Sequence, residues 1–171
     1  LVDLRLDLRR VLTGRATHDR HPALVQRTHR FGPETGSVTA TQPPEARLLV
    51  VEDEPNIREL LATSLRYAGF DVATAASGSE ALRVADVHQP DLCVLDVMLP
   101  DINGKEVCNL VRSDATMDDV RIICISGMVE QEKIQELRDA GADEFMKKPF
   151  DVDQLVTRVC QLLDVETVGI K

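Results

Sequence analysis

The sequence predicts an α/β fold, with a doubly wound parallel sheet covered by helices on both faces. From residue 47 onward, short apolar runs alternate with segments in which apolar residues recur at helical spacing. Three of these runs, at 48–51, 92–95 and 122–125, are continuously apolar, which is typical of strands buried on both faces. The 171 residues suffice for one ordinary domain and an additional segment, but not for a second domain with its own core.

The first predicted strand, 48–51, is bounded by charged residues. Apolar side chains then recur at the spacing of one helix face, at Ile57, Leu60, Leu61 and Leu65. Gly69 follows them and suits the end of a helix. A strand at 70–75 and a helix at 79–87 repeat the pattern. The chain therefore begins its ordered part as strand, helix, strand, helix.

The second half of the chain continues the same alternation. The predicted strands lie at 92–95, 122–125 and 144–146, and the predicted helices at 105–112, about 130–140 and about 153–165. With the first two pairs, five strands alternate with five helices. Such an alternation favours parallel strands joined by helical crossovers.

Residues 1–46 differ in composition from the rest. They carry seven Arg against five Asp and Glu, whereas residues 47–171 have a net charge of −11. The stretch 32–44 is rich in Gly, Pro, Ser and Thr, as linkers are. Residues 1–12 fit a short helix and an alternating strand about equally well, and both readings stay open. We expect an Arg-rich, poorly ordered extension at 1–46, a domain at 47–166 and a tail at 167–171.

The role of the extension also stays open. Its three histidines, His18, His21 and His29, could bind a metal or an anionic partner together with the arginines, but no Cys or paired acidic ligand accompanies them. A solvated linker is the favoured interpretation. Its origin is open as well: the segment could be the tail of a larger protein, or sequence upstream of the natural start.

Composition excludes several classes of function. The four cysteines contain no C-x-x-C pair, which argues against a metal cage, a redox motif or a disulfide framework and favours a reduced, cytoplasmic protein. No apolar run approaches the roughly 18 residues that span a bilayer. The absence of Trp, the 3% aromatic content and the net charge of −9 argue against direct binding of nucleic acid.

Polar residues collect where the predicted strands end. Glu52 and Asp53 follow the first strand, Asp96 the third, Ser126 the fourth and Lys148 the fifth. Because ligands of open parallel sheets bind at the carboxyl ends of the strands, we expect these side chains to meet. Each residue alone has an ordinary structural explanation, such as a turn or a helix cap. Their occurrence after four separate strands is much harder to assign to chance.

The chemistry of this set points to phosphoryl transfer. Three neighbouring carboxylates repel one another unless a cation offsets their charge, and oxygen ligands suit Mg²⁺. A Lys and a Ser hydroxyl beside them can neutralise and bind the oxygens of an incoming phosphoryl group. A carboxylate so placed is a competent nucleophile. The set therefore predicts formation of an acyl phosphate on an Asp.

An ordered series of motifs in the same region resembles a known family. The motifs are Leu-Val-Val-Glu-Asp-Glu at 49–54 with Asn56, Val-Leu-Asp-Val-Met-Leu-Pro-Asp-Ile-Asn-Gly at 94–104, Ile-Ser-Gly at 125–127 and Gly-Ala-Asp-Glu-Phe-Met-Lys-Lys-Pro-Phe at 141–150. With these motifs, the chain resembles the CheY-like receiver domain of two-component response regulators. The resemblance implies a flavodoxin-like five-stranded sheet in the order 2-1-3-4-5.

The resemblance also implies roles for the site residues. Asp96 would accept a phosphoryl group from a phosphohistidine on a histidine kinase or a histidine phosphotransfer protein, assisted by Lys148. Asp53, Asp96 and the backbone carbonyl of Met98 would bind Mg²⁺, with Glu52 acting through a metal-bound water. A cis peptide before the proline at 149 would direct Lys148 into the site.

The resemblance further implies a conformational switch. Ser126 would move toward the bound phosphoryl group, and Phe145 would rotate inward behind it. This rearrangement would bias the face formed by the fourth helix, the fifth strand and the fifth helix, where partners or a second copy dock. We expect a signalling protein rather than an enzyme, and no DNA-binding domain within this chain.

Four positions depart from the usual pattern or bear on the lifetime of the phosphorylated form. Asn103 stands where many members have Asp, and Gly127 replaces a commoner Ala. Met98 and Met128 occupy positions where polar side chains in the family can assist the water that hydrolyses the acyl phosphate. We therefore expect a phosphorylated form that decays slowly without a phosphatase.

Three alternatives fit the residues less well. A haloacid-dehalogenase-type phosphatase needs a second Asp at the position of Met98. A carrier of flavin mononucleotide needs a phosphate-binding loop after the first strand, but the loop at 52–55 is acidic. The more serious alternative is a receiver that acts as an interaction module without phosphorylation.

Overall fold

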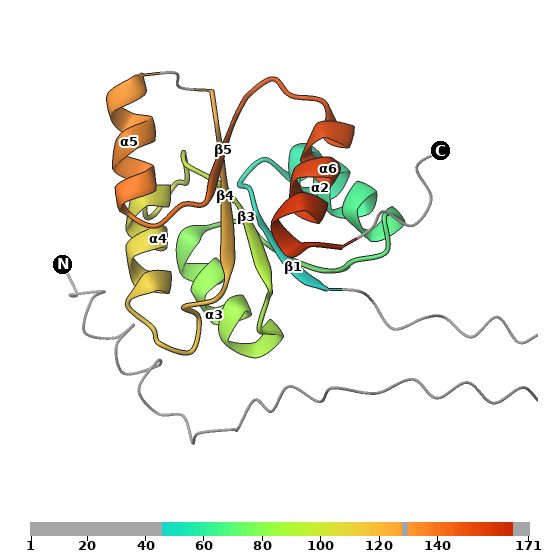
Figure 1. Ribbon diagram of the computed structural model, residues 1–171, viewed down its shortest axis with the longest axis horizontal. Helices are drawn as coiled ribbons and strands as arrows, with labels where there is room; N and C mark the ends of the chain where they lie inside the picture. Colours follow the sequence, from blue (N-terminus) through green and yellow to red (C-terminus); the bar gives the residue numbers. More distant parts are fainter. Residues whose placement is uncertain (1–45, 128–129, 166–171) are drawn as a thin grey trace, which may run out of the picture. The chain divides into compact units, whose positions relative to one another are not determined.

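The computed structural model describes residues 46–127 and 130–165, which form a five-stranded sheet and five helices (Figure 1). The strands are β1 (Arg47–Val51), β2 (Asp71–Ala75), β3 (Leu92–Asp96), β4 (Arg121–Ser126) and β5 (Glu144–Lys147). The helices are α2 (Pro55–Tyr67), α3 (Gly78–His88), α4 (Gly104–Arg112), α5 (Gln131–Asp139) and α6 (Val152–Leu163).

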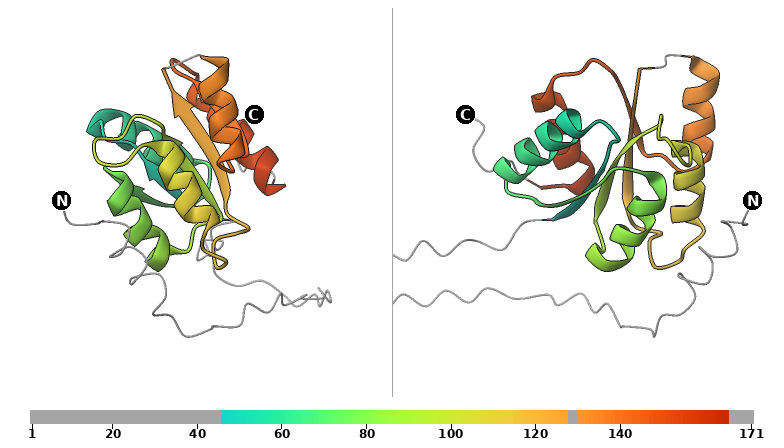
Figure 2. Two further views of the ribbon diagram at one scale, coloured as in Figure 1. Left: turned by 90° about the vertical axis from the view of Figure 1, so that its left-hand side faces the viewer. Right: turned by 180° about the vertical axis from the view of Figure 1, so that it is seen from behind.

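The five strands form one parallel sheet in the order β2-β1-β3-β4-β5. Helices α2 and α6 cover one face, whereas α3, α4 and α5 lie on the other (Figures 1 and 2). Because all strands run in the same direction, their carboxyl ends meet at a single edge of the sheet. The predicted fold class and strand order are confirmed.

The three central strands are almost wholly apolar and buried, because helices cover both of their faces. Successive side chains alternate between the faces. In β3, for example, Leu92 and Val94 pack in the core beneath α2 and α6. The intervening Cys93 instead lines a small apolar cavity with residues of α3 and α4.

Local sequence determines where several helices begin. The side chains of Ser77 and Asn103 accept hydrogen bonds from backbone N–H groups in the first turns of α3 and α4. Asp151 caps α6 in the same way. After α2, Gly69 has a φ of 102°, a conformation that favours glycine and ends the helix there.

The predicted elements agree with the structure except at their ends. The strand predicted at 122–125 extends by one residue in each direction, and the last helix ends at Leu163 rather than near Val165. Apart from Ala46, the predicted extension at 1–46 lies outside the described residues, as does the tail at 167–171. Within the part of the chain that the structure describes, no helix has the length and apolar character needed to cross a bilayer.

Candidate functional site

The three predicted carboxylates meet at the carboxyl edge of the sheet. One oxygen from each of Glu52, Asp53 and Asp96 lies within 4.8 Å of the others. Glu52 and Asp96 are only 1% and 4% exposed, whereas Asp53 lies at the surface. Two buried acids therefore stand behind one that faces solvent.

Lys148 supplies the counter-charge. Its Nζ lies 2.8 Å from Oε2 of Glu52 and 2.5 Å from Oδ2 of Asp96. The peptide bond between Lys148 and Pro149 is cis, as predicted. Its neighbour Lys147 is exposed and makes neither of these contacts. Of the two adjacent lysines, it is thus Lys148, the one expected at the site, that contacts the carboxylates.

Burial and charge act against each other in this cluster. Burial raises the pKa of Glu52, as does the nearby Asp96, although the hydrogen bond from Lys148 acts in the opposite direction. Burial alone lowers the pKa of Lys148, but its bonds to Asp96 and Glu52 raise it above its usual value. The ammonium is therefore held in its charged form between two acids.

Backbone contacts fix the two buried carboxylates. The N–H of Met98 donates to Oδ1 of Asp96 at 2.8 Å, and the N–H of Glu54 donates to Oε1 of Glu52 at 3.3 Å. Arg58 of α2 donates to the carbonyl oxygens of Glu52 and Asp53 at 2.6 and 3.0 Å. No sequence motif singled out Arg58, although its place one turn into α2, directly after the acidic loop, could have indicated it.

The loop after Asp96 closes tightly on itself. The N–H of Gly104 donates to the carbonyl of Val97 at 3.0 Å. A Cβ added at Gly104 would lie 2.8 Å from Cα of Val97 and 3.2 Å from the carbonyl oxygen of Asp96. Only glycine fits there without moving the backbone beside Asp96. This gives a steric reason for the Gly that ends the motif at 94–104.

The same loop is attached to α3 by Asp101, a contact that no sequence motif indicates. The carboxylate accepts hydrogen bonds of 2.9 Å from the N–H groups of both Gly78 and Ser79, and one from the Ser79 hydroxyl. Beside it, the side chain of Ile102 packs closely over Gly78. The partners are 22 or 23 residues apart in the sequence, so no local pattern indicates them.

The remaining predicted site residues lie around this centre. Ser126 is 2% exposed at the end of β4, and its carbonyl accepts a 2.8 Å hydrogen bond from the N–H of Lys148. Phe145 is partly buried on β5, and Met98 is 58% exposed. The second methionine considered in the sequence, Met128, lies outside the described residues.

The donor set fits a small, hard cation. It consists of carboxylate oxygens, with neither thiol nor imidazole among the clustered groups, and such sets suit Mg²⁺. The repulsion among three carboxylates favours a cation of charge two, since Lys148 alone offsets only one of their charges. Glu52, Asp53 and Asp96 could therefore hold a divalent metal.

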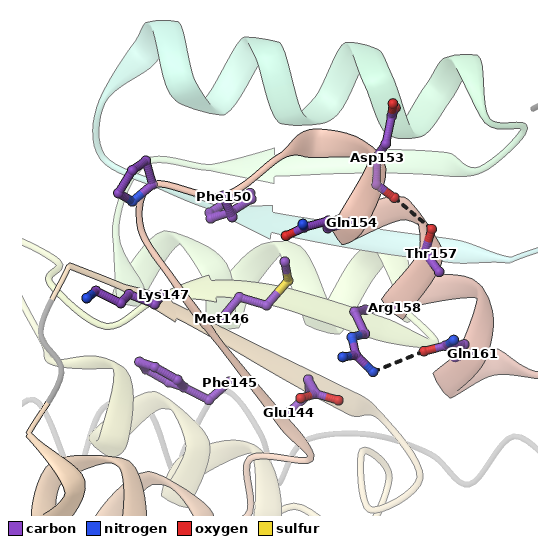
Figure 3. Close-up of a pocket in the computed structure, with 11 residues that line it drawn as sticks. Glu144, Phe145, Met146, Lys147, Phe150, Asp153, Gln154, Thr157, Arg158 and Gln161 are labelled. Atoms are coloured by element: carbon purple, nitrogen blue, oxygen red, sulfur yellow. Dashed lines mark hydrogen bonds between the residues drawn. The ribbon is translucent and has the colours of Figure 1, made fainter.

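A separate groove runs between β5 and α6 (Figure 3). Its volume is ≈ 690 Å³, and its wall combines Phe145, Met146 and Phe150 with charged residues that include Lys147 and Arg158. None of the three clustered carboxylates lines it. β5 is an edge strand, so the groove lies along one edge of the sheet.

The family comparison identifies this arrangement. A family model described as the response regulator receiver domain matches residues 48–160. The matched range runs from the second residue of β1 through most of α6, and it includes the carboxylate cluster and Lys148. The family implied by the sequence motifs is therefore confirmed.

Relatives in sequence and solved structures support the same family. The chain is 39% identical over 118 residues to the DNA-binding dual master transcriptional regulator RpaA of Synechocystis, covering 68% of this chain and 48% of that protein. It is 41% identical over 117 residues to the alkaline phosphatase synthesis transcriptional regulatory protein PhoP of Bacillus subtilis, with coverage of 68% and 48%. The chain thus spans about half the length of these relatives.

Among solved structures, the chemotaxis protein CheY4 of Vibrio cholerae matches with a TM-score of 0.66 and 32% identity, over 68% of this chain and 98% of that one. A putative response regulator from Chloroflexus aurantiacus matches with a TM-score of 0.66 and 34% identity, over 70% and 98%. The described domain therefore corresponds to nearly the whole of each of these structures.

Proposed function

Because the chain belongs to the response regulator receiver family of two-component systems, we propose that it accepts a phosphoryl group on Asp96 and thereby switches a partner-binding surface. The observation that carries this proposal is the position of Asp96. It is buried, held by the N–H of Met98 and within 2.5 Å of Lys148, next to Glu52 and Asp53. If Asp96 served only in a structural ion pair or as a helix cap, the exposed third carboxylate, Asp53, would not be needed beside it.

The chemistry follows from these contacts. A carboxylate oxygen of Asp96 attacks the phosphorus of a phosphohistidine on a histidine kinase or a histidine phosphotransfer protein. The P–N bond breaks and the histidine nitrogen leaves with the electron pair. Lys148 and the hydroxyl of Ser126 bind the oxygens of the transferred group. Mg²⁺ held by Glu52, Asp53, Asp96 and the carbonyl of Met98 would supply further neutralisation of phosphoryl charge.

The groove at α6 supports a docking role for the face formed by α5, β5 and α6. Phe145 stands on β5 directly beside this groove, so a change in its rotamer alters the wall. We propose that a partner protein or a second copy of the chain docks there, with Ser126 and Phe145 linking the surface to the phosphorylated site. The proposal does not extend DNA binding to this acidic domain, because that description belongs to relatives about twice its length.

The first test is phosphorylation by a small donor. The purified protein is incubated with acetyl phosphate, with and without Mg²⁺, beside an Asp96→Asn variant, and intact mass is recorded. We expect a Mg²⁺-dependent gain of one phosphoryl group that the variant lacks. No gain in the folded wild-type protein would contradict the proposal and favour an interaction module that works without phosphorylation.

A second prediction concerns the lifetime of the phosphorylated form. Met98 is exposed beside Asp96 and cannot orient a water for attack as a polar side chain can. We expect the acyl phosphate to decay slowly, and faster in a Met98→Asn variant. Its decay is followed by intact mass after removal of the donor. A wild-type half-life of seconds would refute the prediction.

A further inference from the structure

Two cysteines outside the carboxylate site lie in contact inside the domain. Sγ of Cys108, on α4, is 3.8 Å from Sγ of Cys124, on β4, and each residue is 0% exposed. They are separated by 16 positions in the sequence, and neither is disulfide-bonded. A disulfide has an S–S length of about 2.05 Å, so a shift of under about 2 Å separates the contact from a covalent bond.

The other two cysteines are placed differently. Cys160 belongs to α6 and packs in the core on the opposite face of the sheet. Cys93 lies on β3 and lines a small apolar cavity between the sheet and the two helices α3 and α4. Val107, the neighbour of Cys108 in sequence, lines the same cavity. With a volume of ≈ 10 Å³, this cavity has room for about one water molecule.

We infer that Cys108 and Cys124 form an oxidisable pair, which closes to an intramolecular disulfide when the folded domain meets hydrogen peroxide. The contact between the two sulfur atoms selects this pair among the four thiols. A thiolate is the attacking species in such reactions. The hydrogen bond from Cys124 lowers the pKa of Cys108, with Arg112 acting in the same direction, although burial opposes both.

The reaction balances in two steps. Cys108 first loses its proton; the resulting thiolate attacks one peroxide oxygen, the O–O bond breaks, and the hydroxide released takes up the proton that Cys108 lost to become water. This leaves a sulfenic acid on Cys108. Cys124 then attacks that sulfur, the S–O bond breaks, and the second hydroxide leaves as water with the Cys124 proton. Two thiols and one peroxide give one disulfide and two waters.

The bond would join two elements that both lead to the carboxylate site. Cys124 is two residues before Ser126 on β4, and α4 follows directly on the loop after Asp96. The disulfide would fix α4 against β4, and it would close a loop that is free in the reduced unfolded chain. Oxidation is therefore expected to stabilise the domain, whether or not Asp96 is phosphorylated.

Peroxide treatment of the whole chain tests this inference. The reduced protein is freed of reductant, treated with hydrogen peroxide, alkylated and analysed by intact mass and non-reducing peptide mapping. We expect loss of two hydrogen atoms and a single peptide pair linking Cys108 to Cys124. The urea midpoint of the oxidised protein is expected to rise, and reductant to restore both mass and midpoint.

Matched variants complete the test. Cys108→Ala and Cys124→Ala should each lose the disulfide, whereas Cys93→Ala, from the same layer, should keep it. Mapping of the wild-type protein serves as the reference, so the result does not depend on a variant that folds poorly. A bond through Cys93 or Cys160, a bond between two chains, or oxidation only in urea would overturn the inference.

Discussion

At the scale of single residues, Lys148 is the position where structure and proposed chemistry coincide. One ammonium contacts two buried carboxylates, so its charge offsets repulsion that the fold itself creates. Breaking such a partly buried pair leaves an acid without its cation, which costs more than losing a surface ion pair. Its neighbour Lys147 has the same side chain on the exposed side of β5.

The pair of lysines allows a matched comparison. Lys148→Met should lower the free energy of unfolding at neutral pH by about 1 to 3 kcal/mol, because Glu52 and Asp96 lose their shared cation. Lys147→Met should change it by less than about 0.5 kcal/mol. Urea denaturation in the absence of divalent metal measures both. Equal effects of the two substitutions would show that Lys148 carries no special charge role.

At the scale of elements, the loop between β3 and α4 is the part that holds Asp96 in place. It closes through Gly104 at one end and is fixed to the start of α3 by Asp101 in its middle. The loop that follows Asp96 is thus held by the starts of both α4 and α3. Changes in this loop should therefore disturb the site without touching a carboxylate.

Glycine substitutions test the close approach of Gly104 to the backbone of Asp96 and Val97. Gly104→Ala brings a Cβ to 2.8 Å from Cα of Val97, so the backbone beside Asp96 must move. We expect a loss of about 1 to 3 kcal/mol of stability and slower uptake of phosphoryl from acetyl phosphate. Gly127→Ala is the control, since nothing lies within 4 Å of its Cβ position. Thermal unfolding and intact mass give the two readouts.

The contact between Asp101 and α3 predicts that the stability of the domain depends on pH. Burial opposes the charge on Asp101, but hydrogen bonds from the Ser79 side chain and from backbone N–H groups of Gly78 and Ser79 outweigh it and hold the pKa of Asp101 well below its usual range. A lowered pKa contributes stability above the unfolded value of about 4, and this contribution is lost as pH falls through the folded value.

Asp101→Asn should therefore destabilise the protein at pH 7 by about 1 kcal/mol, as loss of a helix cap does. The difference from wild type should shrink progressively below about pH 4. Asp119→Asn removes an equal charge from an exposed loop position and is the control for loss of charge alone. Urea midpoints between pH 3 and pH 7 distinguish the two variants, and a constant difference for Asp101→Asn would contradict the prediction.

At the scale of the whole molecule, the fold concentrates part of the negative charge at one edge of the sheet. Residues 47–171 carry 11 more acidic than basic side chains, and three of those acids converge at the carboxyl ends of β1 and β3. A folded chain that gathers carboxylates in this way gains stability from any cation that binds only the folded state.

Addition of Mg²⁺ should therefore raise the unfolding midpoint. At a concentration ten times the dissociation constant, the expected gain is about 1.4 kcal/mol. Asp53→Asn should abolish most of this gain, whereas Glu54→Gln, a neighbouring exposed acid outside the cluster, should preserve it. Calorimetry with sodium chloride at matched ionic strength separates specific binding from screening. An identical gain in Asp53→Asn would place the metal elsewhere.

The sequence by itself determined the fold class and most of the site. Strands buried on both faces require continuous apolar runs, and helices between them require apolar residues at helical spacing, so both leave local signals. The residues that follow each strand then identify the candidate site, because parallel strands bring their carboxyl ends together. Glu52, Asp53, Asp96, Ser126 and Lys148 could all be found in this way.

The tertiary structure alone decided which of these residues touch. The bridging of Glu52 and Asp96 by Lys148, the attachment of Asp101 to α3 and the contact between Cys108 and Cys124 join positions between 16 and 96 residues apart. Such contacts depend on the twist of the sheet and the packing of helices on it, which no short pattern in the sequence encodes. The physical reason is that local periodicity specifies elements, whereas packing specifies their neighbours.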